Sequence, residues 1–286
     1  MRAYLAEFLA DPRVVRLPRL VWAPILHGIV LRTRPAKSAE KYAAIWSAEG
    51  SPLAVHTRSQ AEQLRRAIPD TKVEYAMRYG SPDIAGALAR LQGRDVTVLP
   101  LYPQYSESTT ESVADKLPAG TRMIRGFHDH AAYIAALAAN VRRHWEKSGR
   151  GETLIMSFHG LPVRGAGSYE RECRATGMLL AAALGLKDAQ WKVTFQSRFG
   201  YAKWLQPYTE ATLIELAQRG AGRVDVVCPG FVSDCLETLE EIGIVARQRF
   251  LEAGGRELHL VPCLNESPAW IGALALIVRS AAGSIG

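Results

Sequence analysis

Two groups of residues in the sequence have the types and spacing for catalysis. His159 directly follows the apolar run of residues 153–158. An imidazole, with an unperturbed pKa of about 6.5, can accept a proton or bind a transition metal. Glu237 and Glu241 lie four residues apart, so on a helix they would share one face, where two like charges are unfavourable unless a cation or a proton stabilises them. A histidine and two carboxylates around one point could hold a small cation or relay protons.

These residues also have purely structural interpretations. The spacing of Asp234 and Glu237 has the form of a capping box, in which Glu237 would bind a backbone amide at the start of its helix. His159 could hydrogen-bond a neighbouring loop instead of a ligand. We favour chemistry because a histidine and a helix start that each follow a strand can face one another. The spacing alone leaves both interpretations open.

The elements that must position these residues indicate an α/β fold. Short β-branched runs alternate with longer helical patterns, an order typical of parallel sheets covered by helices. We predict two similar Rossmann-like lobes, each a four-stranded parallel sheet flanked by helices. The eight predicted strands are residues 52–57, 72–78, 95–101, 121–127, 153–158, 192–197, 224–229 and 258–262.

The polar stretch of residues 146–152 is the best linker in the chain. We therefore predict an N-terminal lobe of residues 1–150 and a C-terminal lobe of residues 151–266. A last helix, residues 267–286, would begin with Ser267 as N-cap and Pro268 in its first turn, and would pack back on the N-terminal lobe. Ligands of open parallel sheets bind outside the carboxyl ends of the strands, and the segments that follow these strands are rich in Tyr, Ser, Arg, His and Trp.

Composition and motifs exclude several function classes. The formal net charge of +7 favours acidic partners, but the arginines are scattered and no nucleic-acid-binding signature occurs. The four cysteines lie far apart without a CxxC pair, as expected of buried thiols in a reducing cytoplasm. No phosphate-binding glycine loop follows a strand and no GxSxG elbow occurs, which argues against a nucleotide enzyme and a serine hydrolase. No apolar run reaches the roughly 18 residues of a membrane span, so we expect a cytoplasmic protein.

Four long segments carry a family resemblance. They are, in order, LPLYPQYSESTTES, SFHGLPVR, TFQSRFGYAKWLQPYT and CPGFVSDCLETLEEIG, the last followed by VPCLNESPAWI. In this order, and over nearly the whole chain, the sequence resembles ferrochelatases, which insert ferrous iron into protoporphyrin IX at the end of haem synthesis. The resemblance implies the two-lobed chelatase fold, with the porphyrin held in a cleft between the lobes.

The resemblance also implies roles for particular residues. His159 and Glu237 would be the central catalytic pair and would meet the metal, and Glu241 would extend the line of carboxylates behind Glu237. The residues implied to face or surround the porphyrin are Tyr102, Tyr105, Ser106, Ser108, Thr109, Arg32, Arg34, Ser51, Arg78, Gln196, Ser197 and Trp204.

These residue types suit metal insertion. A free porphyrin carries two pyrrole N–H protons that must leave as the metal enters, so the pocket needs a base, which would be His159. Trp204 and Tyr102 would be rigid walls that favour a bent macrocycle, and arginines and hydroxyls would meet the anionic propionates. A chelatase for coproporphyrin or another tetrapyrrole, and a non-catalytic tetrapyrrole carrier, are the alternatives. The segment PQYSESTT favours protoporphyrin.

The sequence departs from the family at both ends. Ferrochelatases begin with a strand that ends in a Gly-Thr-Pro loop, whereas RAYLAEFL follows Met1 at once, so we expect the first strand of the first lobe to be missing. The C-terminus lacks the cysteine-rich tail of members that bind a [2Fe–2S] cluster, and Glu107 stands where some of those members have a cysteine. We therefore expect no cluster and no tightly bound cofactor, with Fe²⁺ as a substrate.

One apolar segment suggests a further partner. Within residues 17–34, Arg19 on one side and Arg32 and Arg34 on the other flank an apolar stretch that is too short to span a membrane. The stretch contains Leu20, Val21, Trp22, Ile25 and Leu26. We expect peripheral, salt-sensitive binding to the anionic inner face of the cytoplasmic membrane, with an ordinary helix packed on the first lobe as the alternative. We expect a monomer.

Overall fold

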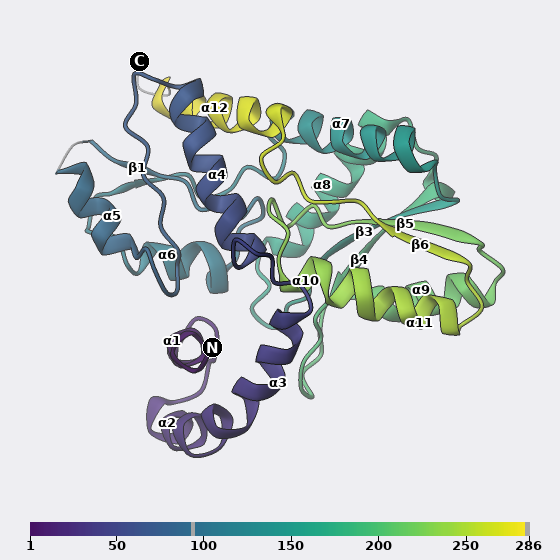
Figure 1. The fold of residues 1–286 in the computed structure, drawn as a ribbon, viewed down its shortest axis with the longest axis horizontal. Helices are drawn as coiled ribbons and strands as arrows, with labels where there is room; N and C mark the ends of the chain where they lie inside the picture. Colours follow the sequence, from purple (N-terminus) through teal and green to yellow (C-terminus); the bar gives the residue numbers. More distant parts are fainter. Residues whose placement is uncertain (93–94, 284–286) are drawn as a thin grey trace. The chain divides into compact units, whose positions relative to one another are not determined.

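The computed structural model describes residues 1–92 and 95–283, which form helices and two parallel sheets (Figure 1). The chain divides into two compact units. The first contains Met1–Pro100 and Ser106–Arg125, and the second contains Leu101–Tyr105 and Gly126–Gly286. The predicted α/β class, with parallel sheets flanked by helices, is confirmed.

The second unit contains the larger sheet, with four parallel strands in the order β4-β3-β5-β6. These are β3 (Thr153–His159), β4 (Trp191–Gln196), β5 (Arg223–Val227) and β6 (Glu257–Leu260), the four strands that the apolar runs of the C-terminal half predict. Ile155, Val224 and Val226 are fully buried and pack with Leu213 and Phe250 from the covering helices. Burial of each such side chain contributes about 1.5–3 kcal/mol, so this core fixes the register of the sheet.

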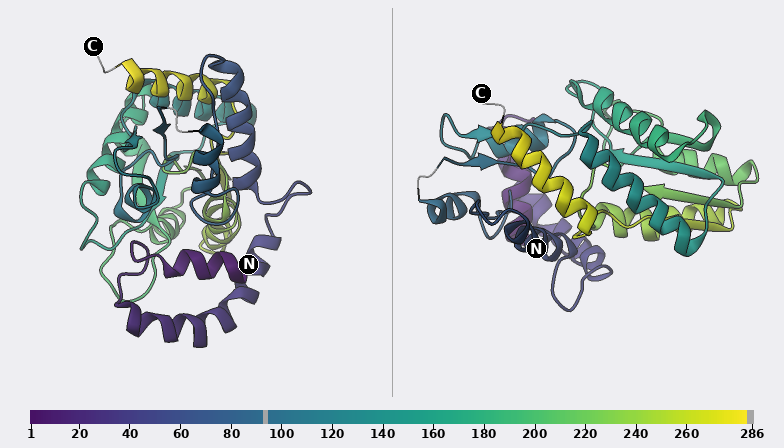
Figure 2. Two further views of the ribbon diagram at one scale, coloured as in Figure 1. Left: turned by 90° about the vertical axis from the view of Figure 1, so that its left-hand side faces the viewer. Right: turned by 90° about the horizontal axis from the view of Figure 1, so that it is seen from above.

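Helices flank this sheet within the second unit. They are α7 (Ala131–Ser148), α8 (Tyr169–Leu184), the short 3₁₀ helix η3 (Asp188–Gln190), α9 (Thr209–Gln218), α10 (Leu236–Leu239), the π-helix η4 (Glu241–Ala246), α11 (Arg247–Glu252) and α12 (Pro268–Gly283). The apolar stripe of α7 is buried at Ile134, Leu137, Ala138 and Val141. Helix α12 begins at Pro268, as predicted, and packs against α7 (Figure 2).

Both α7 and α12 belong to the second compact unit, although α7 precedes the predicted linker. The polar stretch of residues 146–152 therefore joins α7 to β3 inside one unit, with Gly149 ending α7. The predicted lobes, residues 1–150 and 151–266, remain a prediction.

The first unit is mainly helical. Its elements are α1 (Arg2–Ala10), α2 (Arg19–Ile25), the π-helix η1 (Leu26–Val30), α3 (Leu31–Ala43), α4 (Pro52–Ala67), α5 (Ile84–Leu91), β1 (Thr97–Val98), the π-helix η2 (Glu107–Glu111), α6 (Ser112–Ala114) and β2 (Arg122–Met123). Its sheet has two parallel strands in the described residues, with Thr97 opposite Arg122, so the prediction of four strands in each lobe is wrong for this part of the chain.

Two of the predicted strands are not strands. Residues 52–57 form the start of α4, because Pro52 is favoured in the first turn of a helix and Thr57, Ala61 and Leu64 recur on one buried helical face. Residues 72–78 are not part of a sheet in the described chain, and the carbonyl oxygen of Val73 accepts a hydrogen bond from Arg65 Nε at 2.8 Å instead of a ladder partner. Apolar content predicted these segments to be strands, but Pro52 favours the start of a helix in the first, and Arg65 binds the backbone of the second.

Candidate functional site

The candidate site lies at the carboxyl edge of the four-stranded sheet. Strand β3 ends at His159 and β4 at Gln196, and these two residues are opposite one another in the parallel register. The chain leaves β3 through Gly160, whose backbone N–H donates to the Gln196 carbonyl oxygen at 2.8 Å. A Cβ at position 160 would lie 2.6 Å from that oxygen and 3.2 Å from Trp204 Cε3, so only glycine fits here. The loops after β3 and β4 are thus held together beside His159.

The His159 ring has a defined tautomer when neutral. Its Nδ1 lies 2.7 Å from the Gly160 carbonyl oxygen, which can only accept, so Nδ1 carries the proton and donates. The lone pair is then on Nε2, which makes no hydrogen bond to the described part of the chain. The Tyr169 hydroxyl donates to the His159 carbonyl oxygen at 2.9 Å, and burial raises the pKa of Tyr169, which keeps that donor protonated. The site therefore presents a fixed imidazole with a basic nitrogen.

Glu237 lies in the first turn of α10, and its side chain does not cap that helix. The N-cap is Cys235, whose backbone N–H donates to Thr238 Oγ1 at 3.0 Å, and Thr238 Oγ1 in turn donates to Asp234 Oδ1 at 3.0 Å. Asp234 also accepts from Asn265 Nδ2 at 2.7 Å and is buried. The capping-box interpretation of Glu237 is therefore wrong, because the side chain of Thr238 accepts the hydrogen bond from the N-cap amide. The half-buried Glu237 carboxylate is not needed as a cap.

Glu241, at the start of η4, is engaged by the end of β4. Its Oε1 accepts from the Ser197 backbone N–H at 2.6 Å, and its Oε2 accepts from Ser197 Oγ at 2.6 Å and from Gln196 Nε2 at 3.3 Å. Gln196 Nε2 also donates to the Glu237 carbonyl oxygen at 2.8 Å. Gln196 thereby links the strand end opposite His159 to α10, which carries Glu237, and to η4, which begins at Glu241.

The expected set of one histidine and two carboxylates around a cation is not formed. No group of three or more His, Cys, Asp or Glu side chains among residues 1–92 and 95–283 is arranged to hold a metal ion. The physical reason is that Glu241 turns toward Ser197.

Sequence reasoning missed a buried chain of hydroxyl groups beneath the site. Ser157 Oγ donates to Gln196 Oε1 at 2.7 Å and lies 2.8 Å from Thr209 Oγ1, which is 2.8 Å from Thr194 Oγ1. All four residues are buried. The signal was available, because Ser157 and Thr194 are polar residues that each stand between two apolar neighbours in a strand. Such buried polar groups are usually held in hydrogen-bonded networks.

The remaining predicted site residues are divided between the units. Trp204, Tyr102 and Tyr105 belong to the second unit, where the Tyr105 backbone N–H donates to the buried Glu172 carboxylate at 2.7 Å. Trp204 Nε1 is buried and has no hydrogen-bond partner among the residues described. In the first unit Ser106 Oγ lies 2.6 Å from Thr109 Oγ1 and 3.2 Å from Ser108 Oγ. These hydroxyl groups bind one another at the start of η2.

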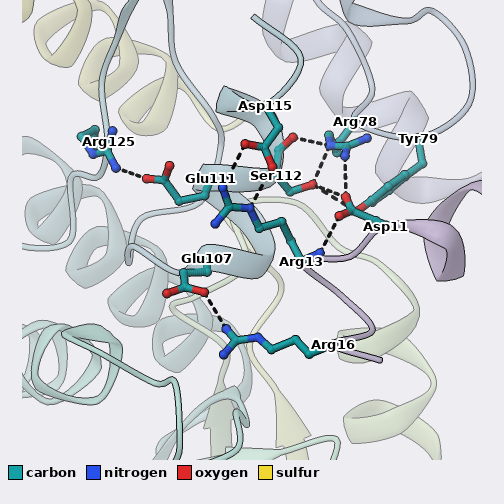
Figure 3. A network of polar contacts seen from close by, with 10 residues as sticks. All are labelled: Asp11, Arg13, Arg16, Arg78, Tyr79, Glu107, Glu111, Ser112, Asp115 and Arg125. Carbon is teal, nitrogen blue, oxygen red and sulfur yellow. Dashed lines mark hydrogen bonds and ion pairs between the residues drawn. The ribbon is translucent and has the colours of Figure 1, made fainter. Parts of the chain in front are cut away.

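Arg78, predicted to border the pocket, is part of a buried network in the first unit (Figure 3). Its guanidinium forms an ion pair with Asp11 and donates to Ser112 Oγ at 2.6 Å. The Asp11 carboxylate also accepts from Ser112 Oγ at 2.6 Å and from the Tyr79 hydroxyl at 2.8 Å. Arg78 therefore links buried side chains inside the first unit.

The other predicted site residues of the first unit lie on α3 and at the start of α4. Arg32 and Arg34 are exposed on α3, and Ser51 is the N-cap residue of α4, whose side chain makes no capping hydrogen bond.

The parallel α/β sheet flanked by helices, with the candidate site at its carboxyl edge, has the chelatase fold. Two solved structures share the fold: CbiX, described as the terminal enzyme for biosynthesis of sirohaem in denitrifying bacteria (TM-score 0.56, 17% identity, 81% of this chain and 95% of that one), and SirB from Bacillus subtilis with Fe3+ (TM-score 0.58, 14% identity, 82% and 92%).

The sequence comparisons narrow the class to one family. The ferrochelatase family model matches residues 1–282. The ferrochelatase of Azoarcus sp. (strain BH72) is 54% identical over 303 aligned residues, which cover 99% of this chain and 83% of that protein. This chain belongs to the ferrochelatase family and is an enzyme that inserts a metal ion into a tetrapyrrole.

Proposed function

We propose that this enzyme inserts Fe²⁺ into protoporphyrin IX to form protohaem, with release of two pyrrole protons. The observation that supports this most is the state of His159. Its Nδ1 donates to the Gly160 carbonyl oxygen, which leaves the Nε2 lone pair to accept a proton, and Gln196, opposite His159 in the sheet, donates to the carbonyl oxygen of Glu237. The porphyrin nitrogens must lose protons to a neutral base of this kind. The PQYSESTT segment supports protoporphyrin over other tetrapyrroles.

In the proposed reaction, a pyrrole N–H transfers its proton to Nε2 of His159, and the nitrogen lone pair that remains bonds to Fe²⁺. The imidazolium keeps its Nδ1 hydrogen bond, so the ring does not have to turn. Glu237 then takes that proton from the imidazolium, which leaves His159 neutral again and able to accept the second pyrrole proton. The porphyrin thus loses two protons and gains one divalent ion, and charge is balanced.

An anaerobic assay of the purified protein tests this proposal. Fe²⁺ is supplied with protoporphyrin IX or with coproporphyrin, and product formation is followed by the change in the porphyrin absorption bands. We expect turnover with protoporphyrin. Faster turnover of coproporphyrin would move the assignment to that substrate, and binding of both porphyrins without turnover would indicate a carrier. Parallel reactions with Co²⁺ and Ni²⁺ test the choice of metal.

We propose that iron is only a substrate and that no [2Fe–2S] cluster or other cofactor is resident. Cluster ligands are thiolates, whereas burial raises the pKa of all four thiols, Cys173, Cys228, Cys235 and Cys263. Protonated, buried thiols support a structural role. Iron and sulfide analysis of the anaerobically purified protein would reveal a cluster if one were present.

We also propose that the enzyme rests on an anionic membrane surface through α2 and η1. None of the described helices has the length and apolarity to cross a bilayer. Leu20 is 91% exposed and Ile29 is 61% exposed, and Val21 and Ile25 are also exposed. Exposed Arg19 and Arg32 lie at the ends of the same segment. An apolar face with flanking cations is the pattern of an interfacial helix.

The structure separates the apolar residues of this segment into two groups. Trp22 Nε1 donates to the Leu9 carbonyl oxygen at 2.7 Å, and Leu26 is 2% exposed in a cluster with Leu5, Leu9 and Leu31. These residues attach the segment to α1 and α3. The lipid-binding group is therefore Leu20, Val21, Ile25 and Ile29, and replacements of Trp22 and Leu26 would test folding instead.

A further inference from the structure

We propose that Glu241 is a positioning residue, which holds Ser197 in a left-handed backbone conformation and thereby fixes the loop of residues 197–204 that ends at Trp204. This inference rests on the proposed function only in taking Trp204 as a wall of the porphyrin site. It differs from the role that the family resemblance implies, in which Glu241 extends a line of carboxylates for metal or protons.

Ser197 has an unusual backbone. Its φ is +62°, in a region that a residue with a side chain seldom occupies without support. The residue is at the point where β4 ends and the loop begins. Glycine would adopt this angle freely, so a serine here must be held by its surroundings.

Glu241 supplies that support from two directions. One carboxylate oxygen accepts from the Ser197 backbone N–H and the other from Ser197 Oγ, each at 2.6 Å. Hydrogen bonds to an ionised carboxylate are short and strong, so the pair fixes both the backbone and the side chain of Ser197. With Gln196 Nε2 as a third donor, at 3.3 Å, both oxygens of Glu241 are engaged.

The buried hydroxyl chain fixes the third donor. Gln196 Oε1 accepts from Ser157 Oγ at 2.7 Å, so the amide must present its NH₂ group to the Glu237 carbonyl oxygen and to Glu241. Thr209 and Thr194 extend the chain into the sheet. The carboxylate of Glu241 is therefore held by the rigid end of β4, and the support for Ser197 is preorganised.

The far end of the loop is also attached to the segment that follows β3. The Val163 backbone N–H donates to the Lys203 carbonyl oxygen at 2.8 Å, and the Leu205 N–H donates to the Leu161 carbonyl oxygen at 2.9 Å. Trp204 packs against Gly160. With both ends attached, the direction that the chain takes at Ser197 decides how the loop runs to Trp204, so release of Ser197 would loosen the indole.

A rescue experiment tests this inference. The variants are Glu241→Ala, Glu241→Ala with Ser197→Gly, and the matched control Glu241→Ala with Ser197→Ala. Glycine needs no support at a positive φ, whereas alanine loses the same hydroxyl group and keeps the strain. We expect Glu241→Ala to raise KM for the porphyrin about tenfold, with a smaller change in kcat, and we expect the glycine variant, but not the alanine variant, to recover most of that loss.

Glu241→Gln provides the second comparison. Its amide oxygen can still accept from the Ser197 N–H, so we expect a KM much closer to that of the wild-type protein than Glu241→Ala gives. Equal losses in Glu241→Gln and Glu241→Ala, with no recovery by Ser197→Gly, would overturn the positioning role and return Glu241 to proton or metal transfer.

A structural readout separates this inference from the proposed function. Hydrogen exchange at residues 197–204 should quicken in Glu241→Ala and slow again with Ser197→Gly, whichever porphyrin the wild-type enzyme uses. Unchanged exchange in Glu241→Ala would contradict the support of Ser197. A wild-type protein that turns over neither porphyrin would contradict the proposed function and leave the exchange result standing.

Discussion

At the scale of single residues, His159 and Glu237 are the groups with the freedom to react. Neither side chain maintains the fold around it, since Thr238 and Asp234 hold the start of α10 and the Gly160 carbonyl oxygen holds the imidazole. We expect His159→Ala and Glu237→Gln each to lower kcat by about 10²-fold or more, the usual contribution of a positioned acid or base, while the porphyrin still binds. Steady-state rates beside porphyrin binding by fluorescence quenching measure both effects.

Thr238→Val is the matched control for Glu237→Gln. It removes the cap of α10 and should cost about 1 kcal/mol of stability in a thermal melt, more than Glu237→Gln costs. If Glu237→Gln instead lowered the melting temperature as much as Thr238→Val and kept its turnover per folded molecule, Glu237 would be a structural residue.

The sequence predicts this pair, because a histidine and a glutamate that follow buried strands come to the same edge of a parallel sheet. The residue that caps α10 could not be assigned from the sequence. Several side chains within one turn can bind the same backbone amides, namely those of Asp234, Cys235, Glu237 and Thr238. The conformation of Ser197 could not be predicted either, because it depends on Glu241, which is distant in sequence and close in the fold.

At the scale of elements, the first unit depends on its buried network. Asp11 joins the end of α1 to Arg78 and to Ser112 at the start of α6. Burial alone would raise the pKa of Asp11, but hydrogen bonds from Ser112, the Arg13 backbone and Tyr79, together with the charge of Arg78, lower it below the ordinary value. The folded state therefore favours the ionised form of Asp11.

We expect Asp11→Asn to lower the free energy of unfolding at neutral pH by roughly 3–5 kcal/mol, since it leaves a buried guanidinium unpaired. A lowered folded-state pKa stabilises the fold above the ordinary carboxyl pKa of about 3.9 and loses this effect as pH falls through the lowered value. The difference between wild type and variant should therefore narrow below about pH 4. Urea unfolding of both proteins at pH 7 and in acid measures this difference in the free energy of unfolding.

Asp115→Asn is the control for that comparison. Asp115 pairs with Arg13 at 2.8 Å, but both side chains are substantially exposed, so its loss should cost less than about 1 kcal/mol. Equal effects of the two substitutions at neutral pH would contradict the importance of burial in this network.

The elements of the second unit were more predictable than those of the first. Parallel strands that are buried on both faces read as continuous apolar runs, as in TLIMSF, and all four predicted strands of the second sheet are strands. In the first unit, PLAVHT is equally apolar at its start, yet Pro52 begins a helix there. Local composition cannot distinguish these outcomes, because a strand needs neighbours that the segment itself does not specify.

At the scale of the whole molecule, the net charge of +7 and the exposed apolar side chains of α2 and η1 are the two features on which the proposed membrane binding rests. Protoporphyrin and haem are apolar apart from their propionates, so they partition into bilayers, and an enzyme that handles both gains from contact with that phase. A positively charged protein concentrates at anionic lipid through an attraction that salt screens. Apolar side chains that enter the interface would then hold it there.

We therefore expect the protein to float with vesicles that contain anionic lipid at low salt and to be partly released at high salt. Leu20→Ser with Ile29→Ser should weaken flotation at both salt concentrations, because these side chains are exposed and their loss removes apolar burial without disturbing the cluster around Leu26. Leu276→Ser, an exposed leucine of α12 in the other unit, is the matched control and should float like the wild-type protein. A protein that stays in the soluble fraction at both salt concentrations, or a Leu276→Ser variant that is weakened as much as the α2 variant, would show that this face does not bind lipid.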